Sequence, residues 1–154
     1  MKTAEDILSQ KHRELVSIPA DRTVREAVER MNDKKIGAIL VTREDAIAGI
    51  WTERDLIRNF LQPDFHPDTD PIGNHMTTEI HSAPHDAELT KLQEMFLGLF
   101  IRHILIKKKE AVIGLLSIGD VLRALLLEKD HQIKELNTIA GWEYYENWGW
   151  DKKK

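Results

Sequence analysis

Hydrophobic residues recur at helical spacing or in short β-branched runs along most of the chain, and this pattern predicts alternating helices and strands. The segment 21–34 is the clearest helix, because its apolar residues share one face and follow a capping pair, Thr23 and Glu26. The other predicted elements of the first half are a helix over 3–13, a strand over 15–18, strands over 36–41 and 46–51, and a helix over 52–62. We expect the last helix to point its apolar residues into the core: Leu56, Ile57, Phe60 and Leu61.

The second half of the chain repeats the first half. A shift of 65 residues, which carries Gly49 onto Gly114, aligns residues 15–62 with residues 80–127 without a gap. Each copy predicts the order strand–helix–strand–strand–helix, and a unit of this size is too small to bury its own apolar strands. We therefore predict an α/β (α+β) fold in which two tandem β-α-β-β-α motifs pack on one another with pseudo-two-fold symmetry.

The predicted organisation has five parts, and the outer two are helices that flank the motifs. In order they are an N-terminal helix over 1–14, a first motif over 15–62, a linker over 63–78, a second motif over 79–127, and a C-terminal helix with an aromatic tail over 128–154. Three prolines between positions 63 and 73 argue against regular structure in the linker. The tail holds five aromatic residues: Trp142, Tyr144, Tyr145, Trp148 and Trp150. They suit an apolar clamp or an anchor for a partner protein better than base stacking, because acidic residues lie among the rings.

Composition excludes several classes of protein. A net charge of −4 provides no basic field to neutralise a nucleic-acid backbone. The chain has no cysteine, which excludes disulfides, zinc-thiolate clusters and thiol nucleophiles. No stretch approaches the roughly 18 apolar residues of a membrane span, and residues 1–10 lack the apolar run of a signal peptide. We therefore expect a cytoplasmic protein with no membrane partner.

The candidate chemistry lies in a Ser/Thr-x-x-Asp step that follows an apolar strand in each copy. The step runs from Thr52 to Asp55 in the first copy and from Ser117 to Asp120 in the second. One interpretation is a capping box, in which the hydroxyl accepts an N–H and the acid reaches back to the cap N–H. The other is a ligand site, because helix N-termini attract phosphate and a carboxylate can accept both hydroxyls of a ribose. Either copy alone favours the cap, whereas the repetition gives weight to the ligand site.

Five short motifs accompany the repeat: Lys35-Ile36-Gly37-Ala38, Thr52-Glu53-Arg54-Asp55, Met76-Thr77, Ile101-Arg102-His103 and Ser117-Ile118-Gly119-Asp120. Together they resemble a tandem cystathionine-beta-synthase (CBS) domain pair, or Bateman module, of the small stand-alone bacterial kind. The resemblance covers roughly residues 5–140, which is nearly the whole chain.

This resemblance implies a regulatory sensor and not an enzyme. CBS pairs bind adenosine compounds (AMP, ADP, ATP, NAD or S-adenosylmethionine) in two clefts between their motifs, and they usually form homodimers. The implied ligand is regulatory, so no catalytic residue, catalytic cofactor or metal is expected. A stand-alone module of this kind also requires a protein partner in trans, which the sequence does not identify.

The resemblance also implies which residues form the clefts. One cleft would combine residues of both motifs: Val16, Ser17, Ile36, Gly37, Ala38, Ser117, Gly119 and Asp120. In this cleft Asp120 would hold the ribose hydroxyls, and backbone groups near Val16 and Ile36 would contact the adenine edge. The other cleft would combine Thr52, Arg54, Asp55, Ile80, His81, Ser82, Arg102 and His103.

Three cations of these motifs are candidates to neutralise a phosphate: Lys35, Arg54 and Arg102. Arg102 is the strongest of them because it lies in an apolar strand, whereas Lys35 fits a solvated surface charge equally well. We expect the Asp120 cleft to bind more tightly, since Gly37 and Ala38 leave room for a purine. Larger side chains crowd the other cleft: His81, Arg102 and His103.

Two other interpretations stay open. If the acids serve only as caps, the clefts are degenerate and the protein is a nucleotide-free dimerisation or protein-interaction module with an aromatic C-terminal anchor. An enzyme ranks third, because the chain has no Gly-x-Ser-x-Gly elbow and no phosphate loop of the Gly-Lys-Ser/Thr kind. The best constellation for chemistry is His75, His81, His85 and Asp86, but Pro84 prevents a helical metal pair.

Overall fold

The computed structural model describes residues 2–11 and 14–129, and the chain divides into two compact units. The first-motif unit comprises residues 14–81, and the second-motif unit comprises residues 1–13 together with the chain from residue 82 onward. Helix α1 (Ala4–Lys11) therefore belongs to the second-motif unit, although it precedes the first motif in the sequence.

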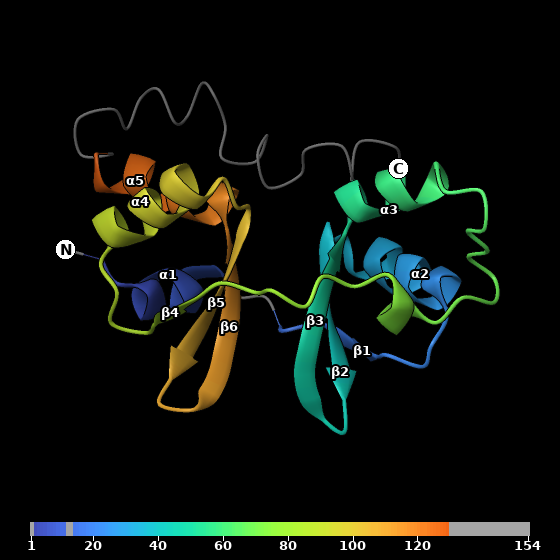
Figure 1. Ribbon diagram of the computed structural model, residues 1–154. Coiled ribbons are helices and arrows are strands. Elements are labelled where there is room, and N and C mark those ends of the chain that lie inside the picture. Colours follow the sequence, from blue (N-terminus) through green and yellow to red (C-terminus); the bar gives the residue numbers. More distant parts are fainter. Residues whose placement is uncertain (1, 12–13, 130–154) are drawn as a thin grey trace. The chain divides into compact units, whose positions relative to one another are not determined.

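The first-motif unit contains one three-stranded sheet and the helices that cover it (Figure 1). Its elements are β1 (Ser17–Pro19), α2 (Val24–Lys34), β2 (Ala38–Arg43), β3 (Ala46–Thr52), α3 (Glu53–Phe60) and the short 3-10 helix η1 (Ile72–Asn74). Strand β2 is central, and it runs parallel to β1 and antiparallel to β3.

The second-motif unit has the same architecture with α1 added. Its elements after α1 are β4 (Ser82–Pro84), α4 (Leu89–Leu99), β5 (His103–Lys108), β6 (Ala111–Ser117) and α5 (Ile118–Glu128). Strand β5 lies between β4 and β6, parallel to β4 and antiparallel to β6. The predicted pair of β-α-β-β-α motifs is thus confirmed, while the predicted helix beyond residue 128 and the aromatic tail lie outside the described residues.

The strand register shows the duplication at the level of single residues. Ser17 pairs with Leu40 in the first unit, and Ser82 pairs with Leu105 in the second, which is the same pair moved by 65 positions. The antiparallel pairs follow the same shift, including an irregularity after Val41 that returns after Ile106. A bulge conserved in position between the halves argues that both copies fold by the same local rules.

Each unit has its own hydrophobic core. Trp51 is the largest fully buried side chain in the first-motif unit, where it packs with residues of the sheet and of α2. The core of the second-motif unit includes Ala4 and Ile7, which fixes α1 to this motif by burial of apolar surface. The backbone adds to this attachment, because the N–H of Ala4 donates to the carbonyl of Ala87 at 2.8 Å.

The predicted inward face of the helix over 52–62 was wrong for three of its four residues. Leu56 packs against the core, but the other three are exposed, at 66% for Ile57, 76% for Phe60 and 79% for Leu61. The cap at Thr52 sets the phase of α3, and this phase turns two polar residues inward instead. The buried pair is Asp55 and Asn59, and Asn59 Oδ1 accepts a hydrogen bond from the indole Nε1 of Trp51 at 2.9 Å.

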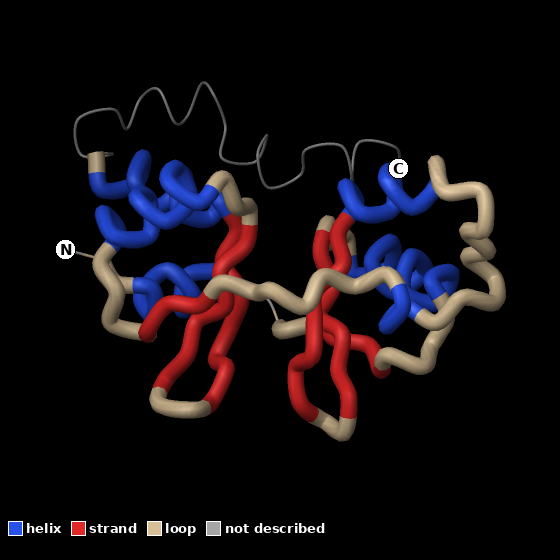
Figure 2. The backbone as a smooth tube through the Cα atoms, in the orientation of Figure 1, coloured by secondary structure: helices blue, strands red, loops and turns tan. Residues whose placement is uncertain are grey.

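The linker packs onto the first motif and does not act as a free spacer (Figure 2). Ile72 is fully buried in the core of the first-motif unit, and Gly73 N–H donates to the carbonyl of Ala20 at 2.9 Å. Thr77 exchanges two backbone hydrogen bonds with Ile50 of β3, at 2.8 and 2.9 Å. Within the part of the chain that the structure describes, no helix has the length and hydrophobicity needed to cross a bilayer.

Candidate functional site

Both Ser/Thr-x-x-Asp steps form capping boxes, so the capping interpretation is confirmed. Asp55 Oδ2 accepts from the N–H of Thr52 at 2.9 Å, and Thr52 Oγ1 accepts from the N–H of Asp55 at 3.3 Å. Asp120 Oδ2 accepts from the N–H of Ser117 at 2.8 Å, and Ser117 Oγ accepts from the N–H of Asp120 at 3.1 Å. A cap uses one carboxylate oxygen, so the capacity to bind a ligand depends on the second oxygen of each acid.

The second oxygen of Asp55 is occupied by an arginine of the same helix. Arg58 Nη2 lies 2.6 Å from Asp55 Oδ1, while Oδ2 is held by the N–H and hydroxyl of Thr52. Both oxygens of this buried carboxylate are therefore engaged. A ribose hydroxyl that approaches Asp55 Oδ1 would have to share this oxygen with Arg58.

Asp120 has a different environment. Its cation is Lys11 of α1, whose Nζ lies 2.7 Å from Asp120 Oδ2 and donates a second bond to the carbonyl of Leu115 at 2.9 Å. Lys11 therefore shares Oδ2 with the N–H of Ser117. Oδ1 of Asp120 has no hydrogen-bond partner among residues 2–11 and 14–129, so it remains an available acceptor.

The chain around the two helix starts also differs. The Glu53 carboxylate lies over Gly37, so the room that we expected beside Gly37 is taken by a flexible side chain of the same unit. Gly119, by contrast, is exposed, and a Cβ at its position would have Ser117 Oγ as its nearest neighbour, at 3.6 Å. The space beside Gly119 is therefore open, although the Asp120 side chain next to it is only 11% exposed.

Val16 and Ile36 were predicted to contact adenine, and in the described chain each has one backbone group without a backbone partner. Val16 accepts at its carbonyl from the N–H of Leu40, and Ile36 donates its N–H to the carbonyl of Met31. The N–H of Val16 and the carbonyl of Ile36 have no backbone partner within the described ranges. Both residues are half-buried and lie in the first-motif unit, together with Ser17 and Ala38.

The three predicted phosphate cations lie in different local environments, and one of them, Arg102, lies in a position other than expected. Arg102 is exposed and precedes β5, so the expectation that it lies embedded in a strand was wrong. Arg54 is exposed on α3, and neither arginine forms an ion pair with the described residues. Lys35 is the C-cap of α2 in the left-handed conformation, with φ of 56°. His103 begins β5, and Ile80 lies half-buried before exposed His81 and Ser82.

The histidines are paired separately with acids. His75 Nε2 lies 2.9 Å from Asp70 Oδ2 in the first-motif unit, and His85 Nδ1 lies 2.8 Å from Glu5 Oε2 in the second. Hydrogen bonds from Lys108 and then His85 hold the pKa of Glu5 below its usual range. The backbone N–H of His66, and then the ring of His75, lower the pKa of Asp70. Among the described residues, no group of three or more potential ligands is arranged to hold a metal ion.

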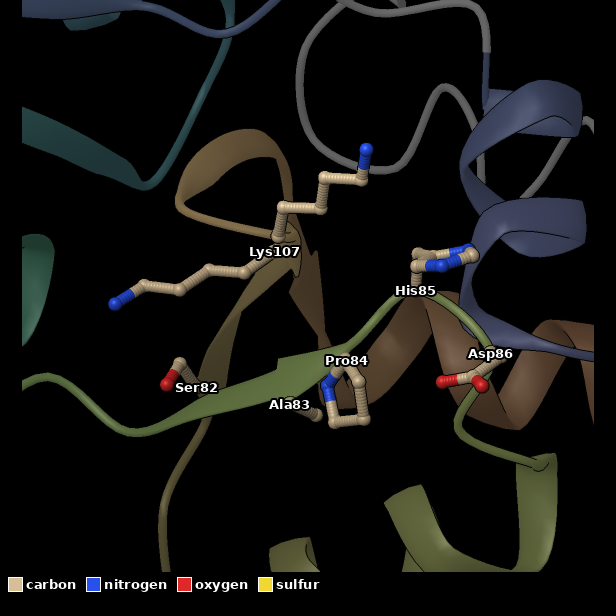
Figure 3. A pocket seen from close by; sticks show the side chains of 7 residues that line it. Ser82, Ala83, Pro84, His85, Asp86 and Lys107 are labelled. Carbon is tan, nitrogen blue, oxygen red and sulfur yellow. The ribbon is translucent and has the colours of Figure 1, made fainter.

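An open hollow of about 370 Å³ lies beside β4 in the second-motif unit (Figure 3). It is lined by Ser82, Ala83, Pro84, His85, Asp86, Lys107 and Lys109. Figure 3 shows His85 and Asp86 on the segment after β4, with Lys107 on the neighbouring strand. Of the predicted site residues only Ser82 lines this hollow, and no residue of α5 does. The hollow is therefore distinct from the helix start that carries Asp120.

The contact between Lys11 and Asp120 was not predicted from the sequence. The helix over 1–14 was expected only to flank the motifs, and no spacing within it indicates a partner 109 residues away. A signal existed at Gly114, where a Cβ would lie 2.5 Å from Leu8 Cδ2. The glycine of the repeated motif therefore admits a helix in the second copy, and this helix carries Lys11 one turn beyond Leu8.

Comparisons with known proteins agree with this architecture. The CBS domain family model matches residues 4–62 and 72–127. CBS domain-containing protein CBSX3, a mitochondrial protein of Arabidopsis thaliana, is 32% identical over 123 residues, which are 77% of this chain and 60% of that protein. An uncharacterized 17.7 kDa protein of Acidianus ambivalens is 30% identical over 68% of this chain and 63% of its own length. The chain thus spans about three fifths of the length of these curated relatives.

Solved structures give the same result. The CBS-domain containing protein ATU1752 from Agrobacterium tumefaciens is 30% identical with a TM-score of 0.74, over 80% of this chain and 98% of that one. The CBS domain protein PAE2072 from Pyrobaculum aerophilum, complexed with AMP, is 26% identical with a TM-score of 0.70, over 82% of this chain and 97% of that one. With both halves of its sequence matched, this chain belongs to the CBS domain family and carries two CBS motifs in tandem.

Proposed function

We propose that this protein is a non-catalytic sensor whose second motif binds an adenosine-containing ligand at Asp120. Family membership supports the class of function, and the AMP complex of the Pyrobaculum aerophilum relative supports the ligand class. AMP, ADP, ATP, NAD and S-adenosylmethionine share the adenosine group that the site would recognise. The predicted combination of Asp120 with residues of the first-motif unit stays a prediction.

The observation that carries this proposal is that Oδ1 of Asp120 has no hydrogen-bond partner among the residues that the structure describes. A carboxylate oxygen without a partner can accept a ribose hydroxyl, and the charge on the acid makes such a bond stronger than one between neutral groups. Gly119, the residue before Asp120, is exposed and has open space around its Cα. Asp55 differs, because each of its oxygens already has a partner, Thr52 on Oδ2 and Arg58 on Oδ1.

The backbone of the first-motif unit supports recognition of adenine. The N–H of Val16 can donate to N1 of adenine, and the carbonyl of Ile36 can accept from its amino group. The Val16 N–H and the Ile36 carbonyl both lack a backbone partner in the described chain. Guanine presents the reversed pattern at this edge, so the same pair would disfavour it.

Calorimetric titration of the whole protein with AMP, ATP, NAD and S-adenosylmethionine tests the proposal. We expect at least one ligand to bind, and Asp120→Asn to weaken that binding by about tenfold or more, since the loss of a charged hydrogen-bond acceptor costs roughly 1.5–3 kcal/mol. Asn can still accept the cap N–H, so the fold is preserved. Asp55→Asn is the matched control and should leave the affinity nearly unchanged. No heat with any ligand would remove the sensor proposal.

A second candidate function is a protein-interaction module, and the exposed apolar residues of the helices favour it. In the first-motif unit these are Ile57, Phe60 and Leu61, and in the second-motif unit they include Leu97, Phe100 and Leu122. Apolar patches on helical faces are typical of protein–protein contacts. We propose a homodimer built on such faces, with a further protein partner in trans. Such an assembly is compatible with ligand sensing, but it does not require a bound ligand.

A further inference from the structure

We propose that Lys11 is a ligand-binding residue of the second motif, where its ammonium group contacts the phosphate of a nucleotide whose ribose is held by Asp120. This inference rests on the proposed function, and it assigns a specific role to α1. Lys11 would make the site selective for phosphorylated adenosine compounds over adenosine itself.

The geometry places a donor and an acceptor side by side. An ammonium group has three donors, and Lys11 uses one on Asp120 Oδ2 and one on the carbonyl of Leu115. Its third donor has no partner in the described chain, and neither does Oδ1 of the same carboxylate. A ribose phosphate matches this pair, because its hydroxyl can donate to Oδ1 while a phosphate oxygen accepts from Nζ.

The position of Lys11 is set by packing and is not a chance surface contact. Its side chain is only 21% exposed, and that of Asp120 is 11% exposed. The helix that carries it is anchored by fully buried Ala4 and by Ile7, and Leu8 fills the space over Gly114. The ammonium group is thus held in place before any ligand arrives, which lowers the entropy lost on binding.

The first motif shows that this arrangement departs from the repeat. Arg58 neutralises Asp55 within α3, and the residue at the same position of α5 is Arg123. The side chain of Arg123 forms no hydrogen bond or ion pair with the described residues, and its Nε is buried there without a partner. Lys11 therefore replaces the local arginine as the cation of Asp120, and it does so without occupying Oδ1.

Electrostatics favours a role in binding over a role in blocking the site. A lone carboxylate at the helix start would repel a phosphate dianion, whereas the pair with Lys11 is neutral and retains a positively charged donor. Competition would require the ligand to take Oδ2 from Lys11. The free Oδ1 makes that exchange unnecessary.

The test compares adenosine with AMP as ligands of the full-length protein, by calorimetry at low salt. We expect Lys11→Met to weaken AMP binding by about tenfold or more and adenosine binding by no more than about threefold, so that the preference for AMP shrinks. Lys11→Arg should keep most of the preference because it keeps the charge. Lys2→Met is the control, since it removes a half-buried lysine beside α1 whose Nζ, within the described chain, donates to Gln10 and not to Asp120.

Each other outcome contradicts the inference in a recognisable way. Equal losses for adenosine and AMP would show that Lys11 only positions Asp120, and tighter binding of either ligand by Lys11→Met would show that it blocks the site. A wild-type protein that binds neither adenosine nor AMP would contradict this inference, whereas the proposed function itself fails only if ATP, NAD and S-adenosylmethionine also give no heat. If thermal unfolding shows that Lys11→Met does not fold, Lys11→Gln replaces it, because the amide can keep the bond to Leu115.

Discussion

At the scale of single residues, equivalent positions of the repeat have taken different partners. Asp55 and Asp120 cap their helices alike, but only Asp120 keeps an oxygen for another molecule. The sequence predicted both caps because a hydroxyl and an acid at this spacing are a local signal. It could not predict which acid stays available, since that depends on Arg58 in one unit and on Lys11, from another part of the chain, in the other.

Glu5 makes stability depend on pH at this same scale. Its folded-state pKa lies below the usual 4.5, because Lys108 and then His85 hydrogen-bond to the carboxylate. The stabilisation is therefore present at pH values above the unfolded pKa and is lost as the pH falls through the folded pKa. We expect Glu5→Gln to lower the Tm slightly at pH 7 and to flatten the fall of Tm in acid.

Thermal melts of both proteins between about pH 7 and about pH 3 check this sign. Asp70 lies in the first-motif unit and has its own lowered pKa, so it should preserve part of the acid sensitivity in the variant. A Glu5→Gln protein whose Tm falls with acid as steeply as that of the wild type would contradict the role given to Glu5.

At the scale of elements, the equivalent glycines of the two motifs, Gly49 and Gly114, leave space for two different neighbouring segments. Gly49 admits the linker, since a Cβ there would lie 2.8 Å from the carbonyl oxygen of Thr77. Gly114 admits α1, since a Cβ there would meet the end of the Leu8 side chain. The segments that flank a motif thus dock against its edge strand, β3 or β6, and the repeated glycine allows both to approach.

Alanine at these glycines should have unequal effects. Gly49→Ala should destabilise the protein by about 1–3 kcal/mol, because a backbone oxygen cannot move aside easily. Gly114→Ala should cost less, since Leu8 can change its rotamer. Urea denaturation of both variants measures the difference, and a larger loss for Gly114→Ala would contradict the packing argument.

The elements themselves were predictable, whereas some of their faces were not. The strands and helices of the motifs follow from hydrophobic periodicity, and each of them occurs at the equivalent position of both copies. The exposed face of α3 was missed because Phe60 and Leu61 suggest a core, while the buried face carries Asn59 bound to Trp51. The sequence predicted α1 as a flanking helix but not the motif on which it packs, and its core contacts are with the second motif.

At the scale of the whole molecule, the exposed apolar residues support the proposal that the protein associates with another copy or another protein. Phe60 and Leu61 are 76% and 79% exposed, and burial of such side chains contributes about 1.5–3 kcal/mol each. The family resemblance implies a homodimer, and we propose that its interface buries these two residues.

The change Phe60→Glu with Leu61→Glu should shift the protein toward monomer. A charge in an apolar contact must be desolvated without compensation, and this cost weakens association. Light scattering coupled to gel filtration measures the mass, with exposed Asp33→Ala on α2 as the control. An unchanged dimer in the double variant would place the contact elsewhere, and a monomeric wild type would refute the dimer.

We propose that an adenosine ligand binds at the helix start that carries Asp120. Titration of ¹⁵N-labelled protein with AMP, followed by NMR at each assigned amide, locates the ligand. We expect saturable shifts at Ser117, Gly119, Asp120 and Lys11, with much smaller shifts at Thr52 and Asp55. Saturable shifts that leave residues 117–120 unmoved, or no shifts at high AMP, would contradict it.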